Sequence, residues 1–452
     1  MSERLSFKEK VGYGLGDMAS NFYMGFFGLF LLYYYTDVYG ISPAAAATML
    51  LVTKVVDAIS DPVMGIIADR TSSRWGKYRP YLLFMAIPYA LLGYLLFSGP
   101  DLSDFGKLAF AYVSYTLVML AYTAINVPYS ALLAVISPSA EERTKATQYR
   151  FIFASLGTLS VSAFATPLVK FLGQGDELLG FRLTILVFAF LSIVLYWITF
   201  ATTRERIVPA KENKSVKEDI SSLAKNKSWQ VLVICGILVV IGLIVRFASI
   251  VYYVKYNMND NGEIIFLIFD RTAMFTSIGL IGQLFGAMST PLFVKYFEKK
   301  SLMILMNLVH VITLLICYFI PPDNFELVVT FHAIGIFTFG VIITLLFSMY
   351  TDCSEYGEWL TGKNSAGLVV SASMFSLKFG SAVGGALPGY LLATFGFVAN
   401  ANQSIETIEG IRFMFNILPA IFFAGAAIVM AFYRLDNESL TKIEIELAER
   451  RS

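Results

Sequence analysis

Long apolar runs alternate with short polar segments along most of this chain of 452 residues. A helix needs about 20 mainly apolar residues to cross the hydrocarbon core of a bilayer. The pattern therefore predicts an all-α membrane protein with twelve transmembrane helices. The expected spans are 12–36, 44–68, 81–98, 108–136, 151–171, 181–201, 230–254, 271–294, 301–320, 327–350, 368–394 and 411–433.

A charged linker divides these spans into two groups of six. The expected parts are a first six-helix bundle (1–201), a cytoplasmic linker (202–229), a second bundle (230–433) and a cytoplasmic tail (434–452). Cytoplasmic loops carry an excess of Lys and Arg. With the N-terminus inside, 25 of the 34 basic residues fall in internal segments, 6 in external segments and 3 within spans. We therefore expect both termini in the cytoplasm.

Composition supports the same class of protein. Hydrophobic residues make up 57% of the chain and charged residues 15%, whereas soluble domains carry about 25% charged residues. The net charge of +1 gives no reason to expect nucleic acid as a partner. The three cysteines and two histidines are scattered and match no metal-ligand spacing. We therefore expect no enzyme and no cofactor.

The second expected span carries two acids within an apolar stretch. Asp57 and Asp61 lie four residues apart, which places them on one face of a helix. A charged side chain inside a membrane costs about 2.5–3.5 kcal/mol or more. This arrangement predicts a positive species between the carboxylates, with Ser60 adding a hydroxyl oxygen. Na⁺ at Asp57 and Asp61 is the expected cation, with Li⁺ and H⁺ left open. The alternative is a structural pairing of Asp57 with Lys54, Arg246 or Lys378.

Several motifs give the chain a family resemblance. The sequence Gly65-x-x-x-Asp69-Arg70, followed by Arg74-Trp-Gly-Lys77, resembles the signature loop of the major facilitator superfamily. Further motifs resemble the glycoside–pentoside–hexuronide:cation symporter family and occur in its order: Gly16-Asp17, Tyr35-Thr36-Asp37, Asp57-Ala-Ile-Ser-Asp61-Pro62, Asn126-Val-Pro-Tyr129, Glu355-Tyr-Gly-Glu358 and Lys378. The resemblance implies the superfamily fold of two six-helix bundles. It also implies a secondary active transporter of the bacterial inner membrane that carries sugar with a cation by alternating access.

The same resemblance implies which residues bind the two solutes. For the cation it adds Thr123, on the fourth span, to Asp57, Ser60 and Asp61. An acid inside a membrane helix is functional by default, and the resemblance assigns Asp17 to sugar hydroxyls. The expected sugar-binding residues are Asp17, Asn21, Tyr122, Asn126, Arg150 and Lys378. Two alternatives remain open: Arg150 as an ordinary positive-inside residue and Lys378 as a charge partner of Asp57.

One departure from the family leaves the substrate open. Where the family's melibiose carriers have a second sugar-binding acid on the fourth helix, this chain has Asn126. An amide still recognises hydroxyl groups but carries no charge. We expect symport of a neutral glycoside or pentoside with Na⁺ or H⁺. The alternatives are a hexuronide or glucuronide symporter and, less favoured, a drug/proton antiporter. The expected partners are the sugar, a monovalent cation and the bilayer, and the carrier is expected to be a monomer.

Opposite charges at two internal loops suggest a cytoplasmic gate. The segment after the second span carries Arg70, Arg74, Lys77 and Arg79. The expected loop after the tenth span carries Asp352, Glu355 and Glu358, although the positive-inside rule favours bases there. Pairing across the two bundles would close the inner mouth and its release would open it. The alternative is that both loops are independently solvated.

Overall fold

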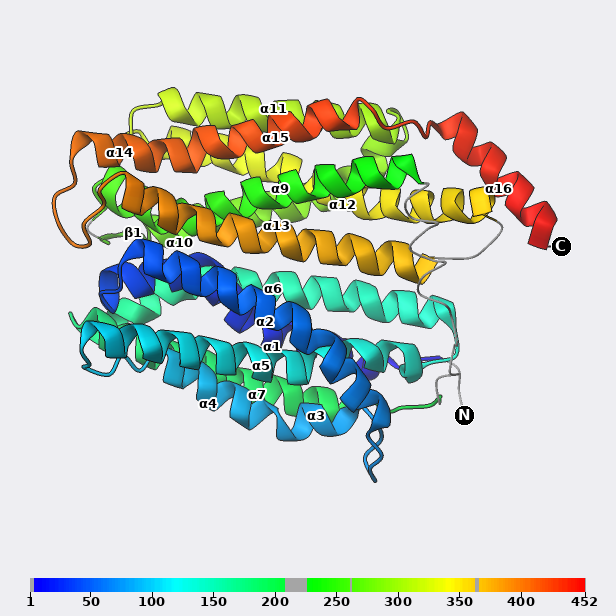
Figure 1. Cartoon of the computed structure of the whole chain (residues 1–452), viewed down its shortest axis with the longest axis horizontal. Helices are drawn as coiled ribbons and strands as arrows, with labels where there is room; N and C mark the ends of the chain where they lie inside the picture. Colours follow the sequence, from blue (N-terminus) through cyan, green and yellow to red (C-terminus); the bar gives the residue numbers. More distant parts are fainter. Residues whose placement is uncertain (1–3, 208–225, 261, 362–365, 452) are drawn as a thin grey trace. The chain divides into compact units, whose positions relative to one another are not determined.

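The chain folds almost entirely into α-helices (Figure 1). The computed structural model describes residues 4–207, 226–260, 262–361 and 366–451. Within this described part, the only sheet is a two-stranded antiparallel hairpin. The all-α prediction is therefore confirmed. The hairpin lies where an irregular loop was expected, between the seventh and eighth spans.

The first of two compact units is formed by Met1–Lys211, Gly262–Met274 and Phe397–Asn402. Most of its helices therefore come from the N-terminal half of the chain. Its elements are α1 (Phe7–Tyr33), the π-helical turn η1 (Tyr34–Val38), α2 (Pro43–Arg70), α3 (Arg79–Phe84), α4 (Ala86–Leu96), α5 (Asp104–Ile136), α6 (Ala140–Gly173), α7 (Glu177–Thr202), β1 (Ile264–Phe266) and β2 (Phe269–Asp270).

The second unit is formed by Glu212–Asn261, Phe275–Gly396 and Gln403–Ser452. Its elements are α9 (Lys227–Tyr252), η2 (Tyr253–Asn257), α10 (Arg271–Val294, which begins in the first unit), α11 (Lys299–Phe319), α12 (Phe325–Thr361), α13 (Ala366–Thr394), α14 (Ile405–Arg412), η3 (Phe413–Ile417), α15 (Leu418–Met430) and α16 (Asn437–Arg451). A hydrophobic core drawn mainly from α9, α11, α12 and α15 holds this unit together.

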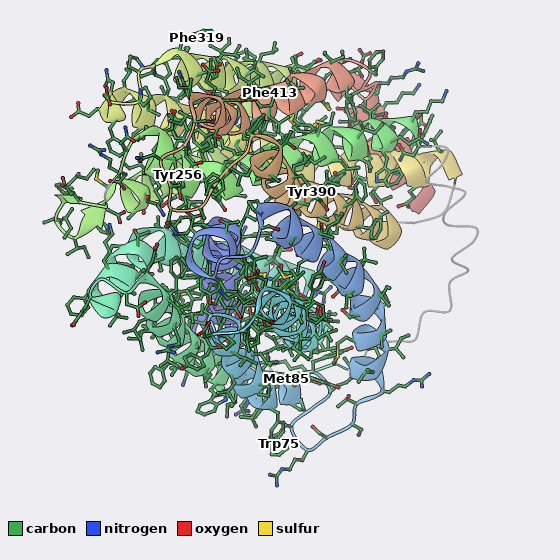
Figure 2. The ribbon with its side chains drawn as sticks, turned by 60° about the vertical axis from the view of Figure 1, so that its left-hand side comes forward. Trp75, Met85, Tyr256, Phe319, Tyr390 and Phe413 are labelled. Carbon is green, nitrogen blue, oxygen red and sulfur yellow. The ribbon has the colours of Figure 1, made fainter. Side chains whose placement is uncertain are left out.

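Nine helices of the described part are long and apolar enough to cross a membrane. They coincide with nine of the twelve expected spans. The other three expected spans fall on α2, on α3 with α4, and on α13. The span expected at 81–98 is divided at Met85, between α3 and α4 (Figure 2). Twelve spans therefore remain a prediction, while the helices that would form them are present.

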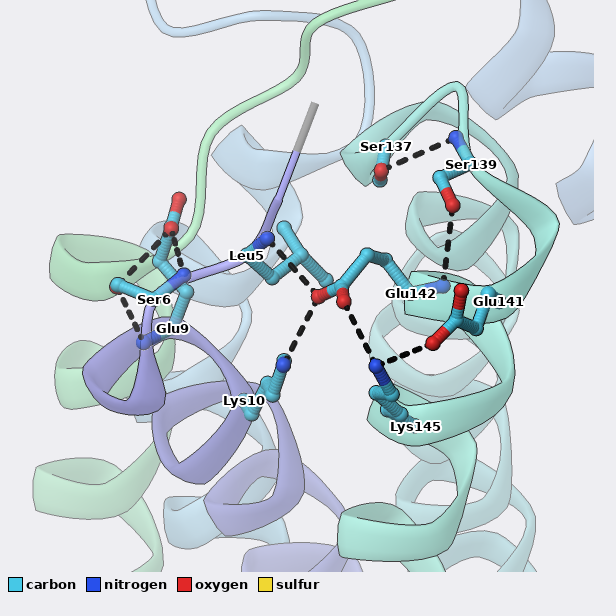
Figure 3. Close-up of polar contacts among 9 residues, drawn as sticks. All are labelled: Leu5, Ser6, Glu9, Lys10, Ser137, Ser139, Glu141, Glu142 and Lys145. Carbon is cyan, nitrogen blue, oxygen red and sulfur yellow. Dashed lines mark hydrogen bonds and ion pairs between the residues drawn. The ribbon is translucent and has the colours of Figure 1, made fainter. Parts of the chain in front are cut away.

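A network of charges fixes the start of α1 against the start of α6 (Figure 3). The backbone N–H of Leu5, a buried residue, donates to the Glu142 carboxylate at 3.0 Å. The same carboxylate pairs with Lys10 of α1 at 2.8 Å and with Lys145 of α6 at 3.2 Å. One acid therefore satisfies groups from both helices and sets their register.

That register continues into the helices. Lys10 and Asp17 are seven residues apart on α1, and Glu142 and Arg150 are eight apart on α6. Both intervals are close to two helical turns, so each pair shares a face of its helix. The contact between Lys10 and Glu142 thus places Asp17 opposite Arg150 two turns further along. Local charge pairing at the helix ends thereby positions two of the expected sugar-binding residues.

A carboxylate also organises the segment between α2 and α3. Glu205, which follows α7, accepts backbone N–H groups of Lys77, Tyr78 and Arg79 at 2.7–3.0 Å. The Tyr78 hydroxyl donates to Asp69 at 2.8 Å. Burial, together with this hydrogen bond, raises the pKa of Tyr78. The expected signature loop is thus held by an acid that lies outside the motif.

Gly76 allows Glu205 to approach this loop, and we expect its substitution to be costly. Gly76 has φ +107°, and a Cβ there would lie 2.6 Å from the Glu205 carboxyl group. Gly175 has φ +101°, and a Cβ added there would meet nothing within 4 Å, so Gly175→Ala carries only the backbone cost of about 1–3 kcal/mol. Gly76→Ala should carry a similar backbone cost and lower the free energy of unfolding by a further ~1–3 kcal/mol. The additional loss arises because the new Cβ would displace the Glu205 carboxylate and leave partly buried N–H groups of the loop without their hydrogen-bond acceptor.

The measurement is the thermal unfolding midpoint of each purified variant in the same detergent. Glu205→Gln should also lower the midpoint, because the amide loses the charge that strengthens these hydrogen bonds. Glu141→Gln is its control, since the Glu141 side chain is 77% exposed. Equal midpoints for Gly76→Ala and Gly175→Ala would show that Glu205 does not hold the loop.

Candidate functional site

Helix α2 has two chemically different faces. Its apolar row Val55, Ile59 and Val63 is 51–64% exposed, as expected of a surface that meets lipid. Asp57 lies on another face and is only 7% exposed. Asp61, one turn further, is partly buried on the same face. The sequence prediction that both acids share one face of a helix is met by this arrangement.

A single hydroxyl group connects the two acids. Thr123 of α5 places its Oγ1 atom 3.2 Å from Oδ1 of Asp57 and 3.1 Å from Oδ1 of Asp61. Ser60 lies beside them, with its Oγ atom 3.4 Å from the Thr123 hydroxyl and 3.1 Å from the carbonyl oxygen of Asp57. The structure therefore brings together all four residues expected to bind the cation.

One hydroxyl hydrogen cannot satisfy both carboxylates of this group. The Thr123 hydroxyl has one hydrogen and can donate it to one carboxylate at a time. The other carboxylate then faces an oxygen lone pair, and two negative charges share a largely buried place. A proton or a small cation among these oxygens removes that conflict. No group of three or more His, Cys, Asp or Glu side chains suited to a metal ion occurs in the described residues.

The alternative interpretation made Asp57 the partner of a basic residue. Arg246, one candidate, is 2% exposed inside the second unit. Its guanidinium donates to the carbonyl oxygen of Phe415 at 3.3 Å and lies 3.0 Å from Nδ1 of His332. The side chain of Asp57 instead accepts a hydrogen bond from Thr123 at 3.2 Å. Arg246 is therefore held by groups of its own unit, and pairing of Asp57 with Lys54 or Lys378 remains an alternative.

A second polar group lies on α1 and α6. Oδ2 of Asp17 is 3.0 Å from Nε of Arg150, and their side chains are 13% and 22% exposed. Arg150 also donates to Ser130 of α5 at 3.3 Å. Asn21 donates to the backbone carbonyl of Asp17 at 2.8 Å. Three of the expected sugar-binding residues are therefore adjacent, and Arg150 is more than a positive charge at the membrane surface.

Two tyrosines support this second group. The rings of Tyr13 and Tyr129 stack with centroids 4.8 Å apart, and the Tyr129 hydroxyl donates to the carbonyl oxygen of Tyr13 at 2.6 Å. The Arg150 guanidinium lies 5.0 Å from the centre of the Tyr129 ring. A Cβ at Gly16 would lie 2.6 Å from that ring, so glycine permits the close approach of α1.

Asn126 and Tyr122 lie on α5 near both groups. The amide oxygen of Asn126 is buried and has no hydrogen-bond partner in the described part of the chain. A buried amide oxygen without a partner costs free energy, which a sugar hydroxyl would recover by donating to it. The Tyr122 hydroxyl lies within electrostatic range of Asp17, Asp57 and Asp61. Both polar groups contact α5, the first through Thr123 and the second through Ser130, about two turns further along.

Two further residues of this region were not among the expected sugar-binding set. Thr158 of α6 donates to the Asn21 amide oxygen at 3.3 Å. It lies eight residues after Arg150, so helical periodicity alone places it on the same face. Tyr13 lies one turn before Asp17 and could have been found in the same way. Threonine and tyrosine are common in helices, so the residue type alone did not indicate a role for Thr158 or Tyr13.

Lys378, the remaining expected sugar-binding residue, lies on α13 of the second unit and is exposed. All the other expected binding residues belong to the first unit. The assignment of Lys378 to the sugar or the cation therefore remains a prediction.

The basic residues of the expected gate have interactions within their own unit. Lys77 lies 3.3 Å from Asp69, and Arg79 donates to the carbonyl oxygen of Phe200 at 2.7 Å. The Arg74 guanidinium lies 4.0 Å from the centre of the Trp75 ring, which sits in the loop beyond α2 (Figure 2). Arg70 is the last residue of α2 and is exposed.

The acidic residues of the expected gate lie on a helix, which corrects the predicted loop. Helix α12 continues to Thr361 and carries Asp352, Glu355 and Glu358. It continues because its extension packs on α16: Trp359 donates to Glu446 at 2.7 Å. Asp352 forms an ion pair with Lys299 of α11 at 2.7 Å. Pairing between the acids and the basic residues of the first unit remains a prediction.

Known proteins resemble this chain along its whole length. A family model described as MFS/sugar transport protein matches residues 12–437. The inner membrane symporter YicJ of Escherichia coli (strain K12) is 34% identical over 455 residues, which cover 99% of this chain and 96% of that protein. The isoprimeverose transporter of Lactiplantibacillus pentosus is 32% identical over 435 residues, covering 95% and 89%. The glucuronide carrier protein homolog of E. coli (strain K12) is 32% identical over 452 residues, covering 100% and 97%.

Apolar helices of membrane-crossing length, with buried acids among them, define a multi-pass membrane transporter. The chain belongs to the sugar transport family of the major facilitator superfamily, and its resemblance to the glycoside–pentoside–hexuronide:cation symporters is confirmed. The family and these relatives are transporters, and none of them is an enzyme. They also do not support the drug/proton antiporter that the sequence left as an alternative.

Proposed function

We propose that this protein is a symporter that carries a neutral glycoside or pentoside together with one monovalent cation. The observation that carries the proposal is the single Thr123 hydroxyl between the carboxylates of Asp57 and Asp61. Such a group offers several oxygens to a positive species, and hard carboxylate and hydroxyl oxygens suit Na⁺, Li⁺ or H⁺. We take Na⁺ as the first candidate. The cation is transported cargo, so this group must bind it and release it in every cycle.

The pairing of Asp17 with Arg150 favours a neutral sugar over a uronide. An anionic uronide would be favoured by a positive charge near the sugar that has no acidic partner. Arg150 already has a carboxylate partner at 3.0 Å. An anionic sugar would have to displace Asp17 or share its partner, whereas a neutral sugar can accept from Arg150 and donate to Asp17. Relatives at 32% identity include both an isoprimeverose transporter and a glucuronide carrier homolog, so identity does not decide between the substrates.

Coupling follows from the closeness of the two groups. The Tyr122 hydroxyl experiences the charges of Asp17, Asp57 and Asp61. A cation at the acid pair lowers the negative potential there, which changes how strongly Tyr122 and Asp17 attract sugar hydroxyls. By linkage, sugar binding then changes cation affinity by the same factor. We further propose that the protein lies in the bacterial inner membrane with both termini in the cytoplasm, as its basic residues favour.

The test is uptake of radiolabelled sugars into membrane vesicles that contain the protein, driven by imposed gradients of Na⁺, Li⁺ or H⁺. We expect a neutral glycoside or pentoside to accumulate under one of these gradients and an ionophore for that cation to abolish the accumulation. Vesicles without the protein are the control. Accumulation of uronides alone would favour the alternative substrate. Equal uptake with and without every cation gradient would contradict symport.

A further inference from the structure

The hairpin formed by β1 and β2 exposes an unbroken apolar segment. Its five consecutive residues are between 42% and 76% exposed: Ile264, Ile265, Phe266, Leu267 and Ile268. No charged or polar side chain interrupts them. Exposed apolar residues are common singly, but a contiguous group of this kind marks a surface that meets something apolar.

The turn of this hairpin places a leucine in a backbone conformation that leucine rarely adopts. Leu267 has φ +55°, in the left-handed region where glycine, asparagine and aspartate are the usual residues. A leucine there costs backbone free energy that a glycine would avoid. Leu267 is also the most exposed of the five residues, at 76%. Its side chain therefore gains little free energy from packing within the described protein. The contact that favours a leucine here must be made with another molecule.

The base of the hairpin is held firmly on α6. The Lys170 ammonium lies 2.5 Å from Oδ2 of Asp270, and Thr166 donates to the other oxygen of that carboxylate at 2.9 Å. Lys170 also donates to the carbonyl oxygen of Gly262, which precedes the paired strand β1 at the same base of the hairpin. The apolar tip is therefore presented from a fixed base and does not belong to a free loop.

The exposed tip continues an apolar surface of α6. The Phe269 ring, in β2, packs against that of Phe164 at 6.2 Å between centroids. Phe164 is 44% exposed, and Phe171, two turns further along α6, is 77% exposed. Helix α6 is one of the helices with the length and composition to cross the membrane. The hairpin thus adjoins an exposed apolar surface of a candidate membrane span.

We propose that the β1–β2 hairpin inserts its tip, Ile264–Ile268, into the interfacial region of the bilayer as a lipid-facing anchor. The helices next to it along the chain, α9 and α10, are both candidate membrane spans, so the short connection between them emerges at a membrane surface. The charged residues Glu263 and Lys170 flank the apolar tip, as expected of a segment at the boundary between headgroups and acyl chains. Lipid is therefore the occupant that removes the tip from water.

The test uses the full-length protein in nanodiscs of phosphatidylcholine and phosphatidylglycerol. Leu267→Cys is labelled with an environment-sensitive fluorophore. The three native cysteines are buried, so the unmodified chain serves as the labelling blank. Asp101→Cys, in an exposed polar segment between α4 and α5, is the matched control. We expect lipids with a nitroxide near the headgroup to quench the label at 267 several-fold more strongly than the label at 101, and iodide to quench it several-fold less.

A label at 267 that iodide quenches as strongly as the label at 101 would overturn the proposal. Protection from both quenchers would also overturn it, because it would place the tip against protein, such as a second copy of the chain. Ile265→Cys provides a second labelling position if the variant at 267 does not fold. The outcome does not depend on which sugar or cation is carried, so it is independent of the proposed function.

Discussion

Asp57→Asn should abolish cation-driven accumulation of sugar while leaving much of the sugar exchange across the membrane intact. The substitution keeps the size of the side chain and removes one of the two negative charges that the Thr123 hydroxyl connects. Without that charge, the attraction between the site and a monovalent cation no longer offsets the free energy needed to remove the ion from water. Sugar would then equilibrate without concentrating, because Asp17 and Arg150 are separate from the acid pair.

Two assays separate these outcomes. Uphill accumulation under a cation gradient measures coupling, and counterflow between equal cation concentrations measures sugar translocation alone. Asp101→Asn is the control, since Asp101 is an exposed acid of the same unit. Normal uphill accumulation by the double variant D57N/D61N would refute the cation site. If Na⁺ is the coupling ion, protons should compete with it at low pH, because both neutralise the same carboxylates.

Breaking the pair of Asp17 and Arg150 should have the second large effect, on both stability and sugar binding. Removing one partner of a fully buried pair costs about 3–5 kcal/mol, because the remaining charge is left uncompensated. These side chains are still 13% and 22% exposed, so we expect a smaller loss of unfolding free energy. Asp17→Asn and Arg150→Gln should each weaken sugar binding by roughly ten- to a hundredfold, the effect of ~1–3 kcal/mol of lost hydrogen bonding.

The double variant distinguishes structure from recognition. D17N/R150Q carries no unpaired charge, so its thermal unfolding midpoint should recover relative to the single variants. Its sugar affinity, measured by calorimetry, should stay low because the charged hydrogen-bonding groups are gone. Glu141→Gln is the control, since the exposed pair of Glu141 with Lys145 contributes only about 0–1 kcal/mol and Lys145 keeps its contact with Glu142. Full recovery of sugar affinity in the double variant would give Asp17 and Arg150 a purely structural role.

Much of the site could be predicted because membrane helices make polar residues conspicuous. Asp57 and Asp61 stand out in an apolar span, and helical spacing alone puts them on one face. Thr123 did not stand out from the sequence, since a threonine in a membrane helix is common and costs little, and only the family resemblance indicated it. The structure places it in contact with two acids more than sixty residues away in the sequence.

The fold was predictable where apolar periodicity is strong and less so where tertiary packing decides. The end of α12 is an example: the charges after Tyr350 indicated a loop, but Trp359 and Glu446 extend the helix by contact with α16. The hairpin is another. Residues 264–270 lie outside the expected spans, and neither the pairing of β1 with β2 nor the contact of Asp270 with Lys170 is visible in a one-dimensional pattern.

The single hydroxyl between two carboxylates also has an electrical consequence. Under the proposed function one such group would bind one monovalent cation, so a cycle that carries a neutral sugar would move one positive charge across the membrane. Moving one charge through 100 mV is worth about 2.3 kcal/mol, which the membrane voltage would add to the chemical gradient of the ion. The same cycle with a uronide would move no net charge and would be indifferent to voltage. The charge of the sugar would thus decide whether a membrane potential can drive this carrier.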